Sequence, residues 1–230
     1  MSEFFLELFS EEIPSKLQTN ARKKLFLELN NYFEENNIKI KGSALAFSTP
    51  NRIVINFSNI SKELLKKSQE IRGPSINAKS EALEGFLKSH NIKKTQTYLK
   101  STEKGEFYFY KSPKQKLQTY DLLKKKLPLI LDKISWNKSM KWGNNQMFWG
   151  RPLKSILALF NGKKIQFKFY HLYSSNLTFI DKDFEEKTKS FNNFKSYQAY
   201  FKLIKIILDQ DKRKEFISNK INKISKKNNL

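Results

Sequence analysis

A β-hairpin is predicted by the stretch Ala44-Leu45-Ala46-Phe47-Ser48-Thr49-Pro50-Asn51-Arg52-Ile53-Val54-Ile55-Asn56-Phe57-Ser58. Its second half alternates between two faces, as a strand does: Ile53, Ile55 and Phe57 lie on one face, opposite Val54 and Asn56. The Pro and Asn in the middle are typical turn residues, so the two halves are expected to pair as antiparallel neighbours. Antiparallel hairpins therefore belong to the fold.

The chain before this hairpin predicts a strand followed by a helix. Residues 3–9 are rich in Phe and Leu and form the strand, which Ser10-Glu11-Glu12-Ile13-Pro14 interrupts. Pro14 suits the first turn of a helix. Apolar residues then recur every fourth position, as expected for about five helical turns: Leu17, Ala21, Leu25, Leu29 and Phe33.

The chain after the hairpin repeats these signals. Further hairpins are expected for 96–100 with 106–111, around Lys104-Gly105, and for 156–160 with 165–169, around Asn161-Gly162. Amphipathic spacing predicts helices over 80–90 and 120–136, with Pro128 as a possible kink or cap. Arg72-Gly73-Pro74 is expected to be a turn or loop.

The last part of the chain has a different character. No Gly follows Gly162 and no Pro follows Pro152, and helical spacing continues to the end. We predict an α+β fold in which antiparallel β-hairpins pack with helices and a helical C-terminal segment follows. The expected boundaries are 1–175 for the α+β domain and 176–230 for the mainly helical segment.

The apolar stripe of this C-terminal segment is expected to divide into two parts. The first part should pack on the preceding domain: Tyr197, Phe201, Ile204 and Leu208. The second has no visible partner: Phe216, Ile217, Ile221 and Ile224. Because an amphipathic helix needs a surface for its stripe, we expect the chain to dock on another subunit or to be the front part of a longer protein.

Composition narrows the function classes. The 230 residues contain no Cys, which excludes disulfides, thiolate metal sites and thiol catalysis. The N-terminus lacks the pattern of a signal peptide and no apolar run reaches the length of a membrane span, so we expect a soluble cytoplasmic protein with no membrane contact.

The net charge is +22, and residues 61–170 hold 24 basic and 8 acidic side chains. A nucleic acid partner fits this charge; lysines scattered over a solvated surface are the alternative.

Arginine is rare here, and its positions are therefore informative. Only five of the 44 basic residues are Arg, and three of them stand beside or near Pro or Gly: Arg52, Arg72 and Arg151. A retained Arg is expected to use its planar five-donor fork, which Lys cannot copy. Each of the three is a candidate for binding RNA or a buried carboxylate through two hydrogen bonds, or else for capping or bracing a turn; for Arg72 the brace is favoured.

One segment concentrates aromatic residues. All three Trp lie within 136–149, interleaved with Lys, Asn and Met. Such a segment can stack bases and hold phosphates, which makes Lys141, Trp142 and Trp149 candidates for RNA binding. The alternative is that the rings anchor the core. This is favoured for Trp142, while both interpretations stay open for Trp149.

Enzyme motifs are missing from the sequence. It contains neither a phosphate-binding Gly-x-x-x-x-Gly-Lys-Ser/Thr loop nor Gly-x-Gly-x-x-Gly. His90 and His171 have no metal-ligand spacing. We therefore assign no catalytic residue, no metal ligand and no cofactor to this chain.

Taken together and in order, the motifs resemble the beta subunit of the bacterial heterotetrameric glycyl-tRNA synthetase. The similarity rests on the opening strand with its acidic pair before Pro, on the Arg-containing turns and on short later motifs. The matching stretches are Phe5–Pro14, Thr49–Ile53, Arg72-Gly73-Pro74, Lys104-Gly105-Glu106, Met140-Lys141-Trp142-Gly143, Phe148 with Arg151-Pro152, and Ile207-Leu208-Asp209 with Arg213.

Two departures from the family pattern stand out. Asn51 replaces an Arg of the family turn, and residues 176–184 lack the family's Gly-His-Arg-Phe stretch. The family's beta subunit is also about three times longer, so the resemblance covers only an N-terminal segment.

The resemblance implies a division of labour. The alpha subunit uses ATP with Mg and glycine, and the beta subunit supports recognition of tRNA(Gly) within an alpha2-beta2 tetramer. The expected function is therefore a non-catalytic part of glycine–tRNA ligase. The alternatives are a stand-alone RNA-binding module and an inactive truncated fragment.

Overall fold

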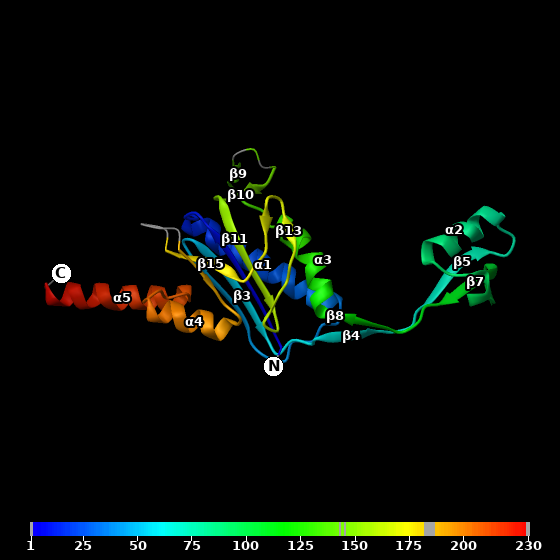
Figure 1. Cartoon of the computed structure of the whole chain (residues 1–230), viewed down its shortest axis with the longest axis horizontal. Helices are drawn as coiled ribbons and strands as arrows, with labels where there is room; N and C mark the ends of the chain where they lie inside the picture. Colours follow the sequence, from blue (N-terminus) through cyan, green and yellow to red (C-terminus); the bar gives the residue numbers. More distant parts are fainter. Residues whose placement is uncertain (1, 143, 145, 182–186, 229–230) are drawn as a thin grey trace. The chain divides into compact units, whose positions relative to one another are not determined.

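The computed structural model describes residues 2–142, 144, 146–181 and 187–228 (Figure 1). Contacts divide the chain into two compact units. The first, here called the sheet unit, comprises Met1–Lys62 and Gln118–Leu230; the second, the inserted unit, comprises Glu63–Leu117. This division differs from the expected boundary at residues 175 and 176, because the C-terminal region packs onto the same sheet as the N-terminal strand.

The sheet unit is built on five antiparallel strands in the order β12-β11-β1-β3-β2. Their bounds are Glu3–Ser10 for β1, Ala44–Thr49 for β2, Arg52–Ser58 for β3, Leu153–Phe160 for β11 and Lys163–Lys164 for β12. The predicted first strand and the predicted hairpin around Pro50-Asn51 are confirmed as β1 and β2–β3. Strand β1 pairs with β3 on one side and β11 on the other, so the N-terminal strand lies inside the sheet.

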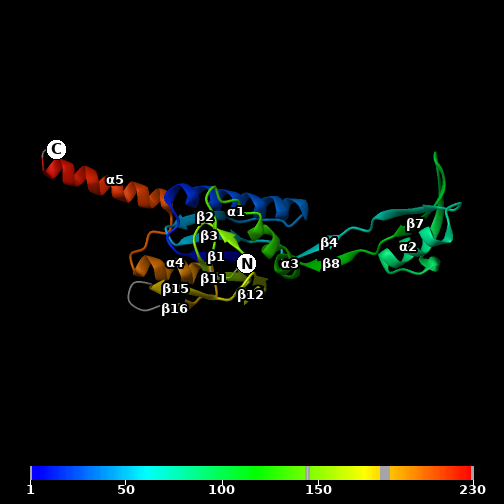
Figure 2. The same cartoon turned by 90° about the horizontal axis from the view of Figure 1, so that it is seen from above.

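Helices cover both faces of this sheet (Figure 2). On one face lies α1 (Ser15–Glu35), and its Phe33 ring meets those of Phe4 and Phe57 at 6.0 and 5.0 Å. On the other lies α4 (Phe194–Leu203), where the ring of Tyr197 meets that of Phe5 at 4.9 Å. Because neighbouring residues of a strand point to opposite faces, Phe4 packs against α1 and Phe5 packs against α4.

The helix α3 (Thr119–Asp132) packs beside α1. It confirms the predicted helix, but it ends at Asp132, before the expected Trp136. Pro128 lies inside the helix without ending it. The N–H that Pro lacks would have bonded to the carbonyl four residues earlier, at exposed Lys124, where water is available.

The third predicted hairpin is only partly correct. After β11 the chain returns at Lys163–Lys164 and then leaves the sheet. Residues 168–169 form β13 (Lys168–Phe169), which pairs with β14 (Leu172–Tyr173). The burial of Phe167 and Phe169 directs this segment away from the sheet edge and into a second layer.

The segment 176–230, which was predicted to be mainly helical, begins with two strands. A hairpin of β15 (Leu177–Asp181) and β16 (Lys187–Ser190) precedes α4. The region without the family's Gly-His-Arg-Phe stretch overlaps β15 and continues into residues 182–186, outside the described part of the chain.

The inserted unit contains a three-stranded antiparallel sheet and one α-helix. The strand order is β5-β7-β6. The bounds are Glu70–Ser75 for β5, Ser80–His90 for α2, Lys94–Gln96 for the 3-10 turn η1, Thr97–Thr102 for β6 and Gly105–Lys111 for β7. A two-stranded ladder of β4 (Glu63–Lys66) and β8 (Gln115–Gln118) flanks it in the sequence. The predicted helix over 80–90 and the hairpin around Lys104-Gly105 are confirmed.

The prediction of a turn at Arg72-Gly73-Pro74 is wrong. These residues lie within β5, where the pairing with β7 is irregular between Arg72 and Ser75. Pro cannot donate to a sheet ladder, which suits a position where the ladder is interrupted. A Cβ on Gly73 would stand 2.9 Å from the Phe86 ring, so the close approach of α2 requires glycine here.

The C-terminal helices follow the predicted apolar stripe with one exception. Tyr197, Phe201 and Leu208 are buried as predicted, whereas Ile204, which was expected to pack with them, is 37% exposed. The helix α5 (Gln210–Lys227) is capped at its N-terminus by Asp209, whose carboxylate accepts hydrogen bonds from the N–H groups of residues 211 and 212. Its apolar side chains are 50–59% exposed: Phe216, Ile217, Ile221 and Ile224. Among the described residues no helix has the length and apolar character needed to cross a bilayer.

We expect the amides of the second half of α5 to exchange hydrogen faster than those of α4. Helical stability comes mainly from packing the apolar face, and in α5 that face is exposed. Hydrogen exchange followed by mass spectrometry on the monomeric chain provides the measurement, with α1 as the control for a helix that packs along its length. Equal protection of residues 216–227 and of α4 would contradict the expectation.

Candidate functional site

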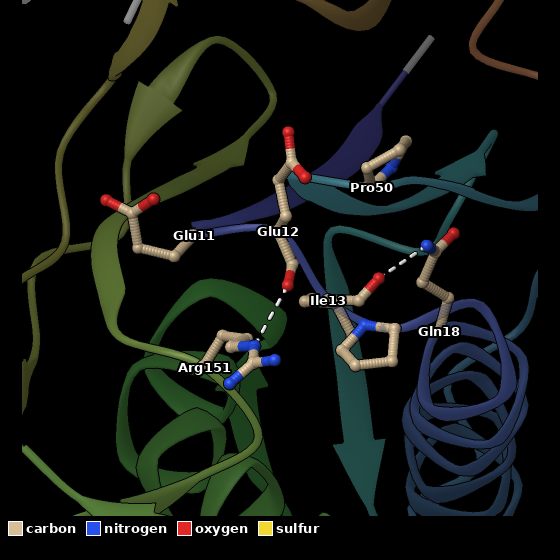
Figure 3. Close-up of a pocket in the computed structure, with 7 residues that line it drawn as sticks. Glu11, Glu12, Ile13, Gln18, Pro50 and Arg151 are labelled. Atoms are coloured by element: carbon tan, nitrogen blue, oxygen red, sulfur yellow. Dashed lines mark hydrogen bonds between the residues drawn. The ribbon is translucent and has the colours of Figure 1, made fainter.

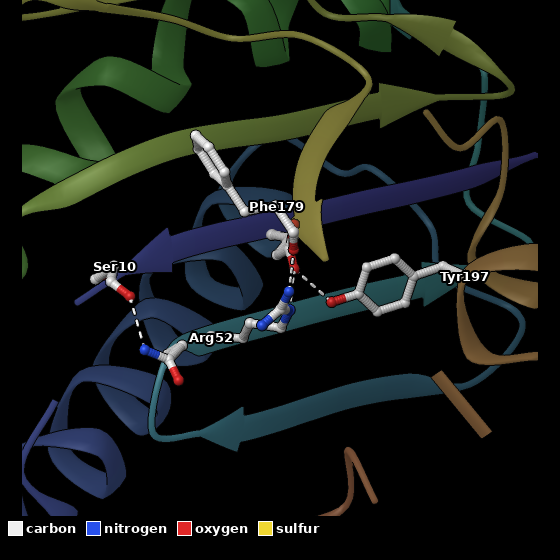
Figure 4. Close-up of polar contacts among 6 residues, drawn as sticks. Ser10, Arg52, Phe179 and Tyr197 are labelled. Carbon is white, nitrogen blue, oxygen red and sulfur yellow. Dashed lines mark hydrogen bonds and ion pairs between the residues drawn. The ribbon is translucent and has the colours of Figure 1, made fainter. Parts of the chain in front are cut away.

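An ion pair is buried between the sheet and α4 (Figure 4). The carboxylate of Glu7, in the middle of β1, lies 2.9 Å from Nε of Arg52 at the start of β3. Both side chains are almost fully buried. The Tyr197 hydroxyl donates to the same carboxylate oxygen at 2.5 Å, and the Arg52 guanidinium donates to the carbonyl of Phe179 in β15. Four elements therefore meet at this pair.

Aromatic rings hold the guanidinium from two directions. The Arg52 Cζ lies 4.6 Å from the centre of the Phe9 ring and 4.7 Å from that of Phe201. Burial raises the pKa of the Glu7 carboxyl, and the nearby Arg52 charge acts against that rise. Burial also raises the pKa of the Tyr197 hydroxyl, and the Glu7 charge adds to it. The arrangement braces the fold, so Arg52 is not available to RNA.

The sequence motifs containing the acidic pair and the two Pro turns meet at one end of the central sheet. The Ile13 N–H donates to the Pro50 carbonyl at 2.7 Å, and the Glu11 N–H to the Pro152 carbonyl at 2.9 Å. Arg151 Nε donates to the Glu12 carbonyl at 3.1 Å. We call this group of three segments, 10–14, 50–52 and 150–152, the turn cluster.

The turn cluster surrounds an open hollow of about 630 Å³ (Figure 3). It is lined by Glu11, Glu12, Ile13, Pro14, Gln18, Pro50 and Arg151. An ion pair of 2.8 Å joins Glu11 to Lys154. With both signs of charge and rigid Pro walls, the hollow suits a polar segment of a protein or nucleic acid better than a small apolar ligand.

The Trp-rich segment is mainly structural. Trp149 is buried, and its ring lies 5.0 Å from that of Trp136 and 5.9 Å from that of Phe169. Trp142 is half-buried, and its Nε1 donates to the Trp149 carbonyl at 3.4 Å. A Cβ on Gly150 would stand 2.3 Å from the Trp136 ring, so glycine allows this stacking.

Lys141 is the exposed member of the segment. It lies in β9 (Met140–Lys141), which pairs with β10 (Phe148–Trp149). Its Nζ donates to the Gln146 side chain at 2.9 Å and lies 5.1 Å from the centre of the Phe148 ring. Phe148 is 58% exposed, so this pair forms an aromatic and basic surface spot.

Arg72 belongs to the inserted unit. Its side chain is exposed and its Cζ lies 3.6 Å from the centre of the Phe107 ring. Within the sheet unit, the structure brings Arg52 and Arg151 to one end of the sheet and connects Trp142 with Trp149.

Sequence reasoning missed Glu7 and Tyr197, which complete the buried pair. A single Glu inside the apolar run Phe4–Phe9 is a signal that could have found the first, because a charge in a buried strand needs a partner. The sequence also did not indicate that Arg22 and Arg213 hold other segments in place through hydrogen bonds. Arg22 donates to the Ser48 hydroxyl at 2.7 Å, and Arg213 donates to the carbonyls of Ile207 and Ser48 at 2.7 and 2.9 Å.

No catalytic arrangement is evident in the part of the chain that the structure describes. There, no three His, Asp or Glu side chains come together as ligands for a metal ion. The most buried carboxylate is already paired inside the core, where it has no access to a substrate.

Comparison with known proteins now assigns the family. A sequence model described as "Glycyl-tRNA synthetase beta subunit" matches residues 4–230. The chain belongs to this family. The matched range spans the turn cluster, the buried ion pair and the whole inserted unit.

The relatives give the same result. The chain is 36% identical over 217 residues to the glycine–tRNA ligase beta subunit of Rickettsia canadensis, covering 94% of this chain and 32% of that protein. It is 34% identical over 230 residues to the beta subunit of Rickettsia prowazekii, covering 100% and 34%. For one strain of Rickettsia bellii the identity is 35% over 230 residues, covering 100% and 35%. The chain spans about a third of the length of these relatives.

We expect Arg52→Lys to lower the free energy of unfolding of the sheet unit by about 3 kcal/mol, because a single ammonium cannot both face Glu7 and fill the space between two rings. Arg151→Lys is the matched control in the same unit. It removes one hydrogen bond at a half-buried site and should cost about 1 kcal/mol or less.

The measurement is urea unfolding followed by tryptophan fluorescence, since all three Trp lie in the sheet unit. Equal decreases in the free energy of unfolding for Arg52→Lys and Arg151→Lys would show that the buried ion pair stabilises the sheet unit no more than an ordinary hydrogen bond does.

Proposed function

We propose that this chain is a non-catalytic part of the beta subunit of glycine–tRNA ligase, and that it supports recognition of tRNA(Gly) and the ATP-dependent glycylation of tRNA. The observation that carries the proposal is the family match over residues 4–230. It agrees with the collinear order of the motifs from Phe5 to Arg213.

The proposal assigns the chemistry to an alpha subunit. That subunit would bind glycine, ATP and Mg, within an alpha2-beta2 assembly in the cytoplasm. The name shared by the relatives, a beta subunit of glycine–tRNA ligase, supports a multi-subunit enzyme.

The role of the chain toward tRNA is supported by its charge. The net charge is +22, and much of the excess lies in residues 61–170. Neutralising phosphates with Lys and Arg provides a large share of the affinity for nucleic acids and makes it sensitive to salt. The turn cluster provides a second, mixed-charge surface, which fits contact with another subunit better than contact with a polyanion.

We expect the purified chain to show no glycine-dependent exchange between ATP and pyrophosphate on its own, and to co-purify with the alpha subunit when the two are co-expressed. The complete alpha and beta subunits of a relative serve as the positive control for exchange and for glycylation. Exchange by the chain alone would refute the non-catalytic assignment. Failure to retain the alpha subunit would favour the stand-alone RNA-binding module.

A further inference from the structure

The sheet of the inserted unit has one face that carries aromatic and basic side chains. The strand register brings them together: Tyr98 stands opposite Phe109, Arg72 opposite Phe109, and Lys100 opposite Phe107. Residues directly opposite in an antiparallel pair point to the same side of the sheet. We call this set the open face: Arg72, Tyr98, Lys100, Phe107, Phe109 and Lys111.

The helix α2 covers the other face of the same sheet (Figure 1). The ring of His90, on α2, lies 4.9 Å from Phe86 and 6.3 Å from Tyr110. Tyr110 alternates with Phe109 along β7, so the two rings point to opposite sides. Within residues 63–117, all of which the structure describes, the only α-helix therefore lies away from the open face.

Two groups on the open face are held by neighbouring rings. Phe109 is buried, and the ring of Tyr98, its direct cross-strand neighbour, lies at 27° to it with centroids 6.2 Å apart and remains 39% exposed. The Arg72 Cζ lies 3.6 Å from the centre of the Phe107 ring, and Lys100 Nζ lies 5.3 Å from that of Phe109. The face thus presents one partly exposed aromatic ring and one planar guanidinium, each beside a second aromatic ring.

The charge of this face favours an anion. Glu70 is its one carboxylate, and it accepts hydrogen bonds from the Tyr98 hydroxyl and from Lys100. These contacts fix the Tyr98 ring and hold the pKa of Glu70 below its ordinary value, with the hydrogen bond from Lys100 as the main cause. No carboxylate among the described residues forms an ion pair with Arg72. The whole inserted unit contains 12 basic and 6 acidic side chains.

We infer that the open face binds unpaired nucleotides of RNA, with bases stacked on the Tyr98 ring and the Arg72 guanidinium and with phosphates near Lys100 and Lys111. Aromatic rings and guanidinium planes stack on bases that have left a helix, whereas a paired duplex offers no free base. That the RNA is tRNA rests on the proposed function; the binding of unpaired RNA does not.

The test measures binding of the whole chain to three fluorescent probes: a tRNA(Gly) transcript, a 12-nucleotide oligouridine and a 12-base-pair RNA duplex. Tyr98→Leu removes the ring, and Tyr98→Phe is the matched control that keeps it. Arg72→Gln removes the guanidinium, and Lys88→Gln on α2 is the control with the same change of charge. Circular dichroism verifies that each variant is folded.

We expect Tyr98→Leu and Arg72→Gln to weaken binding of the oligouridine and the transcript by about fivefold or more, the lower end of what one stacked base contributes. Tyr98→Phe and Lys88→Gln should stay within about twofold of the unchanged chain, since neither removes a stacking partner. The duplex should bind more weakly than the oligouridine, and its affinity should change in neither Tyr98→Leu nor Tyr98→Phe.

Three results would overturn the inference. They are absence of oligouridine binding by the unchanged chain, unchanged affinity in Tyr98→Leu and Arg72→Gln, and equal losses in Arg72→Gln and Lys88→Gln. If Tyr98→Leu does not fold, cross-linking of the unchanged chain to oligouridine containing 4-thiouridine decides: cross-links within β5, β6 or β7 support the open face, and cross-links found only elsewhere refute it. Retention of the alpha subunit is measured separately on the unchanged chain, so it tests the proposed function independently of these variants.

Discussion

A charge inside the central strand sets the conditions for the rest of the sheet unit. Glu7 lies in β1 with strands on both sides, and no water reaches it. Burying a carboxylate costs several kcal/mol unless a counter-charge and hydrogen bonds compensate. Arg52, Tyr197 and the rings of Phe9 and Phe201 provide this compensation. The positions of β3 and α4 on β1 are therefore linked to one carboxylate.

This pair lies next to the turn cluster, and the two features support each other. Arg52 begins β3 directly after Pro50-Asn51, whose carbonyls accept hydrogen bonds from Ile13 and Ser10. The turn that positions the guanidinium thus also holds the start of α1. The motif Pro50-Asn51-Arg52 is explained by packing alone. The neighbouring segments of the turn cluster line the open hollow, which another molecule can reach.

Much of the fold could be predicted from local patterns, and the site could not. Period-four spacing identified α1, which buries one regular face. Strands β1 and β3 were found from their apolar runs and from the turn between β2 and β3, and both are buried on both faces. The spacing of α2 was also recognised, although none of its residues is fully buried. The β15–β16 hairpin escaped because its strands carry no clear alternation, and Arg72-Gly73-Pro74 was assigned to a turn because a bulged strand has the composition of one. Glu7 precedes Arg52 by 45 residues and Tyr197 follows it by 145, and only the tertiary structure brings the three side chains together.

The inserted unit begins and ends at neighbouring points of the sheet unit. The Thr119 N–H donates to the Lys62 carbonyl at 2.9 Å, and the Thr119 hydroxyl donates to the Ser61 carbonyl at 2.6 Å. The 55 residues between them thus form a closed loop on a host whose own strands pair without them. Since the entropy of loop closure grows only slowly with length, such a segment can be lengthened, shortened or exchanged at little cost to the host. Evolution can therefore change what the loop binds while the sheet continues to fold.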